Sequence, residues 1–218
     1  MLEKYYWKAG FIAVAGLDEV GRGCFAGPVV TAACVFTPDL KLSHKSMGVR
    51  IDDSKRLSPK NREAASKWIK DNVLVWALGE ASVVEINRRG MKKASEAAFR
   101  RAVYSANTKL KSKNLAELDY LLIDAFYIPK VAGLPKHHQK AILGGDSISM
   151  SIAAASIVAK VYRDRLMSEY SVDSKYKNYG WERNKGYGTK AHQQALLKYG
   201  TTDLHRKAYI NTWKNKNR

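Results

Sequence analysis

The alternation of short apolar runs with longer segments of helical spacing most constrains how this chain folds. Two apolar runs, residues 11–17 and 27–36, come first, and a glycine-rich stretch separates them. Further strand candidates are residues 73–81, 119–124 and 140–143. Helical spacing recurs in residues 58–71, 91–110, 148–170 and 189–199. Because strands that alternate with helices build sheets covered by helices, the pattern predicts an α/β fold.

Two of the predicted helices carry start signals. Ser58 precedes Pro59, which suits an N-cap followed by proline at the first helical position. Ser82 and Glu85 have the spacing of a capping box and predict a short helix before the longer one that starts at residue 91. Residues 37–53 are polar and basic, and residues 126–140 contain two prolines, so both segments are predicted to be loops.

The length of 218 residues, with no internal repeat or linker, predicts a single domain over 1–218 whose part from about 171 onward is helical. Lys and Arg number 38 against 20 Asp and Glu, a net charge of +18, which favours a nucleic-acid partner over a merely solubilising surface. The basic residues are scattered, which disfavours a membrane surface. No apolar run reaches the roughly 18 residues of a membrane span, and the start lacks a signal-peptide pattern, so a cytoplasmic protein is expected. Cys24 and Cys34 are expected to be reduced and buried.

Acidic residues stand at the ends of three predicted elements of this basic chain. Asp18 and Glu19 follow the first strand candidate, Asp124 ends the strand near residue 121, and Asp146 precedes a helix. Taken singly, Asp146 suits a helix N-cap, Asp124 a turn, and the adjacent pair a salt bridge with Arg22. If the strands are neighbours, the acids converge and need a cation, and oxygen ligands suit Mg²⁺ or Mn²⁺. Both members of the adjacent pair reach one metal only if the chain bends there, because neighbouring strand residues face opposite ways.

A glycine turn, Gly21-Arg22-Gly23, comes directly after the acidic pair. Its glycines permit close backbone approach, its N–H groups form an anion-binding nest, and the arginine adds a fork of donors suited to phosphate. The alternative is a hairpin turn with a surface arginine. Beside a pair of metal ligands, the same turn would hold a phosphate where phosphodiester chemistry needs it.

Two further segments carry candidate substrate contacts. In the loop from Lys185 to Lys190, Tyr187 is suited to stack on a sugar or base while Lys185 touches phosphate, although a tyrosine that plugs the core edge fits as well. Ser54 and Lys55 either contact substrate or belong to a polar turn.

These segments together resemble the ribonuclease HII family, the bacterial type 2 ribonucleases H, from about residue 15 to residue 209. The matching stretches are AGLDEVGRG from Ala15, AGPVVTAA from Ala26, DDSKRLS from Asp52, LLIDA from Leu121, GDSISMSIAAASIVAKVYRDR from Gly145 and KGYGTKAH from Lys185. Their order and spacing make the resemblance specific. The chain departs from common residues of the family at Cys24, Phe25, Ala125, Gly144 and Asn184, and it keeps all four acids.

The resemblance implies a ribonuclease H-like fold, with a central mixed β-sheet flanked by helices and a helical C-terminal segment. It implies an endoribonuclease that hydrolyses the RNA strand of RNA–DNA hybrids and nicks duplex DNA 5′ to embedded ribonucleotides, leaving 3′-hydroxyl and 5′-phosphate ends. Such an enzyme removes ribonucleotides from DNA and clears RNA primers. Its partner is nucleic acid rather than a membrane, and a monomer is expected.

The resemblance also implies roles for individual residues. Two divalent ions, Mg²⁺ or Mn²⁺, would be held by Asp18, Glu19, Asp124 and Asp146. The glycine turn would sense the 2′-hydroxyl and grip the junction phosphate, and Tyr187 would stack on the following sugar.

Three alternatives compete with ribonuclease HII. Ribonuclease HIII carries an extra N-terminal domain, for which the position of Asp18 leaves no room. A non-catalytic basic nucleic-acid-binding module, or a scaffold protein, would leave the acids unexplained.

Overall fold

Five strands form one mixed sheet in the computed structural model, which describes residues 2–39 and 48–216. The strands are β1 (Val14–Val20), β2 (Val29–Val35), β3 (Val75–Ala81), β4 (Tyr120–Asp124) and β5 (Gln139–Ile142). Their order across the sheet is β3-β2-β1-β4-β5. The β1–β2 and β2–β3 pairs are antiparallel, whereas β4 runs parallel to both β1 and β5. This is the mixed sheet of the expected α/β fold.

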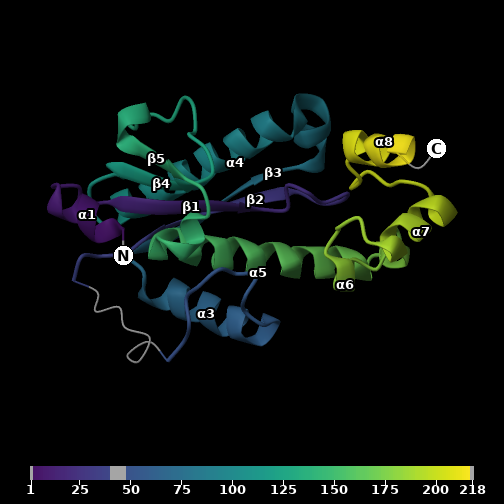
Figure 1. Ribbon diagram of the computed structural model, residues 1–218, viewed down its shortest axis with the longest axis horizontal. Coiled ribbons are helices and arrows are strands. Elements are labelled where there is room, and N and C mark those ends of the chain that lie inside the picture. Colours follow the sequence, from purple (N-terminus) through teal and green to yellow (C-terminus); the bar gives the residue numbers. More distant parts are fainter. Residues whose placement is uncertain (1, 40–47, 217–218) are drawn as a thin grey trace.

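Helices cover both faces of the sheet (Figure 1). The described helices are α1 (Glu3–Lys8), α3 (Pro59–Asn72), α4 (Val83–Ser112), α5 (Met150–Val172), α6 (Trp181–Asn184), α7 (Lys190–Tyr199) and α8 (Lys207–Lys216). Short 3₁₀ turns stand at Lys136–His138, Gly145–Ser147 and Lys177–Tyr179. Helix α4 lies on one face, α5 and then α3 lie on the other, and α6 to α8 gather at one end. The helical C-terminal part is therefore as predicted.

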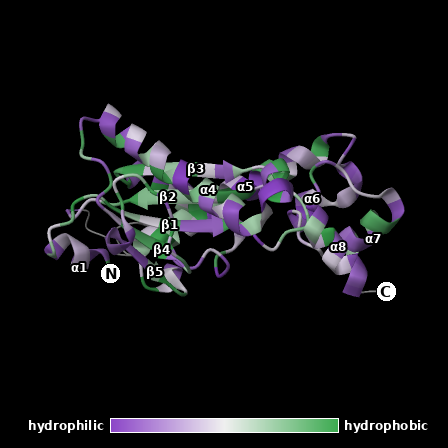
Figure 2. Ribbon diagram, turned by 90° about the horizontal axis from the view of Figure 1, so that it is seen from above, coloured by the Kyte–Doolittle hydropathy of each residue, from purple (hydrophilic) through white to green (hydrophobic). Residues whose placement is uncertain are grey.

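The core has two layers, one on each side of the sheet. Phe99 and Leu110 of α4 pack on one face, and Ile69 of α3 with Ile157 of α5 packs on the other. Strand β2 is buried along its whole length, because helices cover it from both sides. Hydrophobic residues accordingly concentrate around the sheet (Figure 2).

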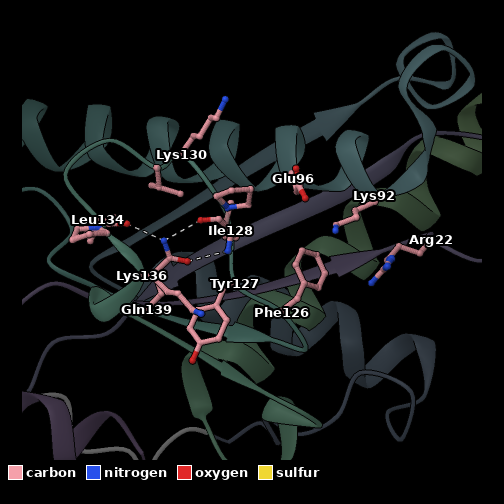
Figure 3. A pocket seen from close by; sticks show the side chains of 13 residues that line it. Arg22, Lys92, Glu96, Phe126, Tyr127, Ile128, Lys130, Leu134, Lys136 and Gln139 are labelled. Atoms are coloured by element: carbon pink, nitrogen blue, oxygen red, sulfur yellow. Dashed lines mark hydrogen bonds between the residues drawn. The ribbon is translucent and has the colours of Figure 1, made fainter.

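Helix α4 is broken at Gly90, where the backbone takes φ 78° and ψ 160°. Ser82 and Glu85 form the predicted capping box at its start. The prediction of a short helix followed by a longer one from residue 91 is thus confirmed. Lys92 lies in the first turn after the break, and its side chain is near Arg22 (Figure 3).

Some predicted boundaries are wrong. The first strand was predicted to end at residue 17, but pairing of Glu19 with Thr31 and of Val20 with Val30 carries β1 onward. Helices α1, α6 and α8 were not predicted. Ser149, not Asp146, caps α5, because its side chain accepts a hydrogen bond from the N–H of Ile152. Residues 40–47 of the predicted loop 37–53 lie outside the described residues.

The C-terminal part returns to the start of the chain. The N–H of Arg206 donates to the carbonyl oxygen of Phe25 (2.8 Å), and Ala26 pairs with His205 in an isolated bridge. Beneath this junction Ala26, Met167 and Trp181 belong to one buried cluster with residues of α7 and α8. The turn after β1 is therefore built against a segment that is far away in the sequence.

Candidate active site

Three segments that carry predicted acids lie side by side where β1 and β4 leave their parallel pairing. The last paired residues are Leu17 and Ile123, and the next residue on each strand is an aspartate, Asp18 and Asp124. The Asp124 carboxylate accepts a hydrogen bond from the N–H of Gly145 (2.9 Å), which places the 3₁₀ turn that contains Asp146 beside it. The prediction that these separate segments meet at one end of the sheet is borne out.

Burial and mutual repulsion shape the charge state of the acidic pair. Burial raises the pKa of Asp18 to about 7, the charges of Glu19 and Asp124 add to the rise, and the Ser156 hydroxyl opposes it. Burial also raises the pKa of Glu19 to about 7, Arg22 opposes this rise, and the charge of Asp124 adds to it. Each carboxylate is thus destabilised as an anion by its burial and by neighbouring acids, which is the electrostatic condition of a site that receives a cation.

Asp146 has an acidic neighbour, Asp53, which was not among the predicted metal ligands. Burial raises the pKa of Asp146, and the charges of Asp53 and Asp124 raise it further, while Lys55 opposes them. Asp53 therefore stands close enough to join the acidic group. Its place in the segment DDSKRLS was the available signal, because that segment supplied Ser54 and Lys55 as candidates.

Asp18 and Glu19 lie within β1 rather than after it, and the charge of Asp124 raises the pKa of both. Glu19 Oε1 accepts a hydrogen bond from Arg22 Nη1 (2.9 Å), which confirms the salt bridge that was considered from sequence. Its other oxygen, Oε2, is buried with no hydrogen-bond partner in the described residues. An unpartnered buried carboxylate oxygen is costly unless a cation or donor arrives.

The acids suit a divalent cation by their chemistry and charge. Among the described residues, no group of three or more His, Cys, Asp or Glu side chains is drawn together closely enough to hold a metal. The donors available at this end of the sheet are carboxylate oxygens, which hard cations such as Mg²⁺ and Mn²⁺ prefer. The raised pKa values of Asp18 and Glu19 and the orphaned Oε2 of Glu19 fit such an ion.

The glycine turn leaves β1 directly beside the acids, and a buried arginine of α5 lies under it. Gly21 takes φ 96°, and a β-carbon there would stand 2.2 Å from Arg163 Nε. Arg163 is fully buried and donates to the carbonyl oxygens of Pro28 (3.0 Å), Ala26 (3.0 Å) and Lys185 (2.9 Å). The turn and the loop at Lys185 are thereby tied to one helix.

A second buried arginine, Arg206, holds the same turn from the C-terminal side. It donates to the carbonyl oxygens of Gly21 (2.6 Å), Arg22 (2.9 Å), Gly27 (2.9 Å) and Pro28 (3.0 Å). Burial lowers its pKa to about 10. From sequence, Arg206 was considered only as a residue that could line the substrate groove, and Arg163 was not singled out, although it lies in the segment quoted for the resemblance.

The remaining candidate substrate contacts differ in how exposed they are and in what their side chains contact. Tyr187 is 39% exposed and has Lys160 Nζ 5.6 Å from its ring centre. Lys185 Nζ donates to Ser168 Oγ (2.5 Å) and to the carbonyl oxygen of Glu182 (2.7 Å), so its ammonium is engaged within the protein.

Ser54 is buried against Ser156, with 2.9 Å between the two Oγ atoms, and Lys55 is exposed. Their roles toward substrate stay predictions.

The family model described as Ribonuclease HII matches residues 15–216 of this chain. The chain belongs to the ribonuclease HII family. A ribonuclease HII of Alkaliphilus metalliredigens is 42% identical over 209 residues, which cover 96% of this chain and 95% of that protein. One from the Wolbachia of Brugia malayi is 44% identical over 196 residues, covering 90% and 87%. Membership makes this chain a hydrolase, an endoribonuclease of the ribonuclease H type that acts on RNA in RNA–DNA hybrids and depends on divalent metal.

Solved structures of ribonucleases H share the fold. The ribonuclease HII in a PCNA complex from Archaeoglobus fulgidus aligns with a TM-score of 0.67 at 21% identity, covering 89% of this chain and 94% of that one. A ribonuclease HIII called Bst-RNase HIII, in complex with Mn²⁺, aligns with a TM-score of 0.66 at 22% identity, covering 93% and 68%. These likenesses confirm the ribonuclease H-like fold of this member of the ribonuclease HII family. Within residues 2–39 and 48–216, no helix has the length and apolar character of a membrane span.

Proposed function

We propose that this ribonuclease HII family member nicks duplex DNA on the 5′ side of embedded ribonucleotides, besides cleaving RNA–DNA hybrids, and leaves 3′-hydroxyl and 5′-phosphate ends. The observation that carries the proposal is that the segments of Asp18, Asp124 and Asp146 lie side by side, next to the Gly21 turn. Acids alone would support general phosphodiester hydrolysis. The adjoining turn supplies backbone donors at the position where a ribose 2′-hydroxyl must be read.

The proposed metal ligands are Asp18, Glu19, Asp124 and Asp146, with Asp53 as a further carboxylate beside them. Two ions of Mg²⁺ or Mn²⁺ are proposed; a Mn²⁺ complex is described for the structural neighbour Bst-RNase HIII. Bound there, the ions would activate a water for attack on phosphorus and stabilise the leaving 3′-oxygen.

The chain's own residues orient the substrate. Arg22, 43% exposed along its side chain and paired with Glu19, presents its fork next to the acids and is proposed to bind the junction phosphate. Gly21 and Gly23 bring backbone close to the ribose, and Tyr187 is proposed to stack on the next sugar. Ser54, Lys55 and Lys185 are proposed as supporting contacts.

The protein is proposed to act as a monomeric single domain, with nucleic acid as its partner and ribonucleotide and RNA-primer removal as its role. A cytoplasmic site of action follows from the proposed substrate, since that is where bacterial DNA lies. The net charge of +18 would hold the duplex without regard to its sequence.

An end-labelled DNA duplex with one ribonucleotide tests the proposal. With Mg²⁺ or Mn²⁺, one nick directly 5′ to the ribonucleotide is expected, while an all-DNA duplex stays intact. Asp124→Asn should abolish the nick and keep duplex binding. Binding without a nick by the unmodified chain would contradict the proposal and favour a non-catalytic binding module.

A further inference from the structure

A pocket of about 740 Å³ opens next to the candidate active site, between the loop that follows β4 and the first turns of α4 after Gly90 (Figure 3). Arg22 stands at one end of it, near Lys92 of α4. The Arg22 guanidinium carbon lies 5.2 Å from the ring centre of Phe126 in the loop wall, and the same guanidinium is paired with Glu19. One arginine thus joins the pocket to the acidic group.

The loop wall of the pocket is held in place by the protein itself. Gln139 Oε1 accepts from the N–H of Ile128 (2.9 Å), and Gln139 Nε2 donates to the carbonyl oxygens of Ile128 (3.0 Å) and Leu134 (2.8 Å). Arg100 of α4 donates to the carbonyl oxygen of Pro129 (3.1 Å). Because buried Gln139 and part-exposed Arg100 satisfy the loop backbone, the loop wall is held without a ligand.

The charge of the rim is mostly positive. The cations that line the pocket are Arg22, Lys92, Lys130 and Lys136, and Glu96 is the one acid among the lining residues. In the part of the chain that the structure describes, no ion pair engages the three lysines. A rim with unpaired cations beside a site for phosphate favours an anionic occupant.

Aromatic rings complete the lining. Tyr127 is 41% exposed and Phe126 is half-buried. Lys136 Nζ lies 4.9 Å from the Tyr127 ring centre, so a cation and a ring face stand together, as the Arg22–Phe126 pair does at the other end. Ring faces beside cations match a nucleotide, whose base or sugar stacks while its phosphate meets the charge.

We propose that this pocket, defined by Arg22, Lys92, Phe126, Tyr127, Lys130 and Lys136, binds one nucleotide of the substrate strand adjoining the junction phosphate. The base or sugar rests on Phe126 and Tyr127, and the phosphate meets Lys92 and its neighbouring cations. The inference rests on the proposed function, since it extends the grip of Arg22 by one nucleotide along the strand.

Steady-state nicking of a single-ribonucleotide duplex by three variants tests the inference. Tyr127→Ala should raise KM about tenfold, because stacking on one ring is lost. Lys92→Ala should raise KM about fivefold and reduce the slope of log affinity against log salt by about 1, the loss of one phosphate contact. Lys93→Ala is the matched control, because Lys93 is the exposed neighbour on α4 and does not line the pocket. It should keep the unmodified KM and salt slope.

Shortened duplexes locate the nucleotide. Two shortened duplexes are used, one lacking the nucleotides on the 5′ side of the ribonucleotide and one lacking those on the 3′ side. With one of these two duplexes, Tyr127→Ala and Lys92→Ala should no longer raise KM. Persistence of both effects with both shortened duplexes would overturn the inference, since no flanking nucleotide would then occupy the pocket. An unchanged KM in both variants, with melting temperatures unchanged, would overturn it too and favour another occupant, such as an acidic peptide.

These results stay separable from the proposed function. If the unmodified chain does not nick the duplex at all, the proposed function fails first. If it nicks, and the pocket variants behave like Lys93→Ala, only the pocket assignment fails.

Discussion

The imidazole rings of His192 and His205 face each other in the C-terminal helical part, with 3.1 Å between their Nε2 atoms. The N–H of Thr202 donates to His205 Nδ1 (2.9 Å), so the neutral His205 carries its proton on Nε2 and donates it to His192. His192 also accepts from Trp181 Nε1 (3.2 Å), and its Nδ1 then donates to the carbonyl oxygen of Tyr187 (2.9 Å). Both rings are buried, and this arrangement requires both to be neutral.

Acid should therefore destabilise this part of the protein. Burial lowers the pKa of His205 from 6.5 to about 4, with the neighbouring His192 adding to the fall, and burial lowers the pKa of His192 too. As the pH falls from about 6.5 to about 4, the unfolded chain takes up a proton that the folded chain refuses, so up to about 3 kcal/mol of stability is lost. Urea unfolding at pH 7 and pH 4.5 measures the loss, and His205→Gln should reduce it, whereas exposed His137→Gln should not. Equal losses in all three proteins would refute the prediction.

Arg206→Lys should weaken both stability and nicking. A lysine ammonium cannot replace a fork that serves four carbonyl oxygens, those of Gly21 and Arg22 in the glycine turn and those of Gly27 and Pro28 beyond it, so a loss of about 3 kcal/mol in the free energy of unfolding is expected. The rate of nicking should fall as well, because Gly21 and Arg22 lose their support. Denaturant unfolding and the nicking assay measure the two effects. Arg165→Lys, on the exposed side of α5, is the control, and an equal change in both variants would speak against a role of Arg206 in the turn.

The two glycines of the turn should respond differently to alanine. Gly21→Ala places a β-carbon 2.2 Å from Arg163 Nε at φ 96°, and the hydrogen-bonded Arg163 cannot yield, so a cost of about 2–4 kcal/mol is expected. No heavy atom stands within 4 Å of a β-carbon at Gly23, so Gly23→Ala should keep the melting temperature. Thermal unfolding of both variants decides the matter, and equal melting temperatures would show that the tight contact at Gly21 is not maintained.

Divalent metal should stabilise the folded protein through the acidic group. Binding only to the folded state adds about 2.7 kcal/mol at a concentration of one hundred times Kd. Asp124→Asn should abolish the Mn²⁺- or Mg²⁺-dependent rise in melting temperature. Asp124→Asn should not lower the melting temperature measured without metal. The charge of Asp124 raises the pKa of Asp18 and Glu19, so removing that charge relieves repulsion in the folded protein. Asp71→Asn, an exposed acid on α3, serves as control. A full metal response in Asp124→Asn would remove Asp124 from the ligand set.

The sequence allowed the alternation of elements and the meeting of the acids to be predicted, because these follow from local periodicity and from strand ends. The break at Gly90 was predictable for the same reason, since the capping signal at Ser82 and the helical pattern from residue 91 are both local. The end of β1 was not predictable from local sequence. An acidic pair looks like the end of a strand, but pairing with the distant β2 extends β1 to Val20.

The buried arginines show the limit of such reasoning most clearly. In the sequence, Arg163 stands among charged residues of α5, and a charged residue in that setting is normally solvent-exposed. Arg163 can be buried because the carbonyl oxygens of Ala26 and Pro28 accept its hydrogen bonds. Arg206 can be buried because Gly21, 185 residues away, and its neighbours accept hydrogen bonds from it. Helix α8 escaped prediction because it is short and basic and is held by contacts with a similarly distant segment.

The hydrogen bond between Arg206 and Gly21 also bears on the order of events during synthesis. The turn that would handle the scissile phosphate is translated near the start of the chain, and its carbonyl oxygens gain their last partner only after residue 206 has been made and has folded back. A nascent or prematurely released chain therefore carries the acids without a finished turn. We expect such a chain to lack nicking activity until the C-terminal part has folded onto the turn.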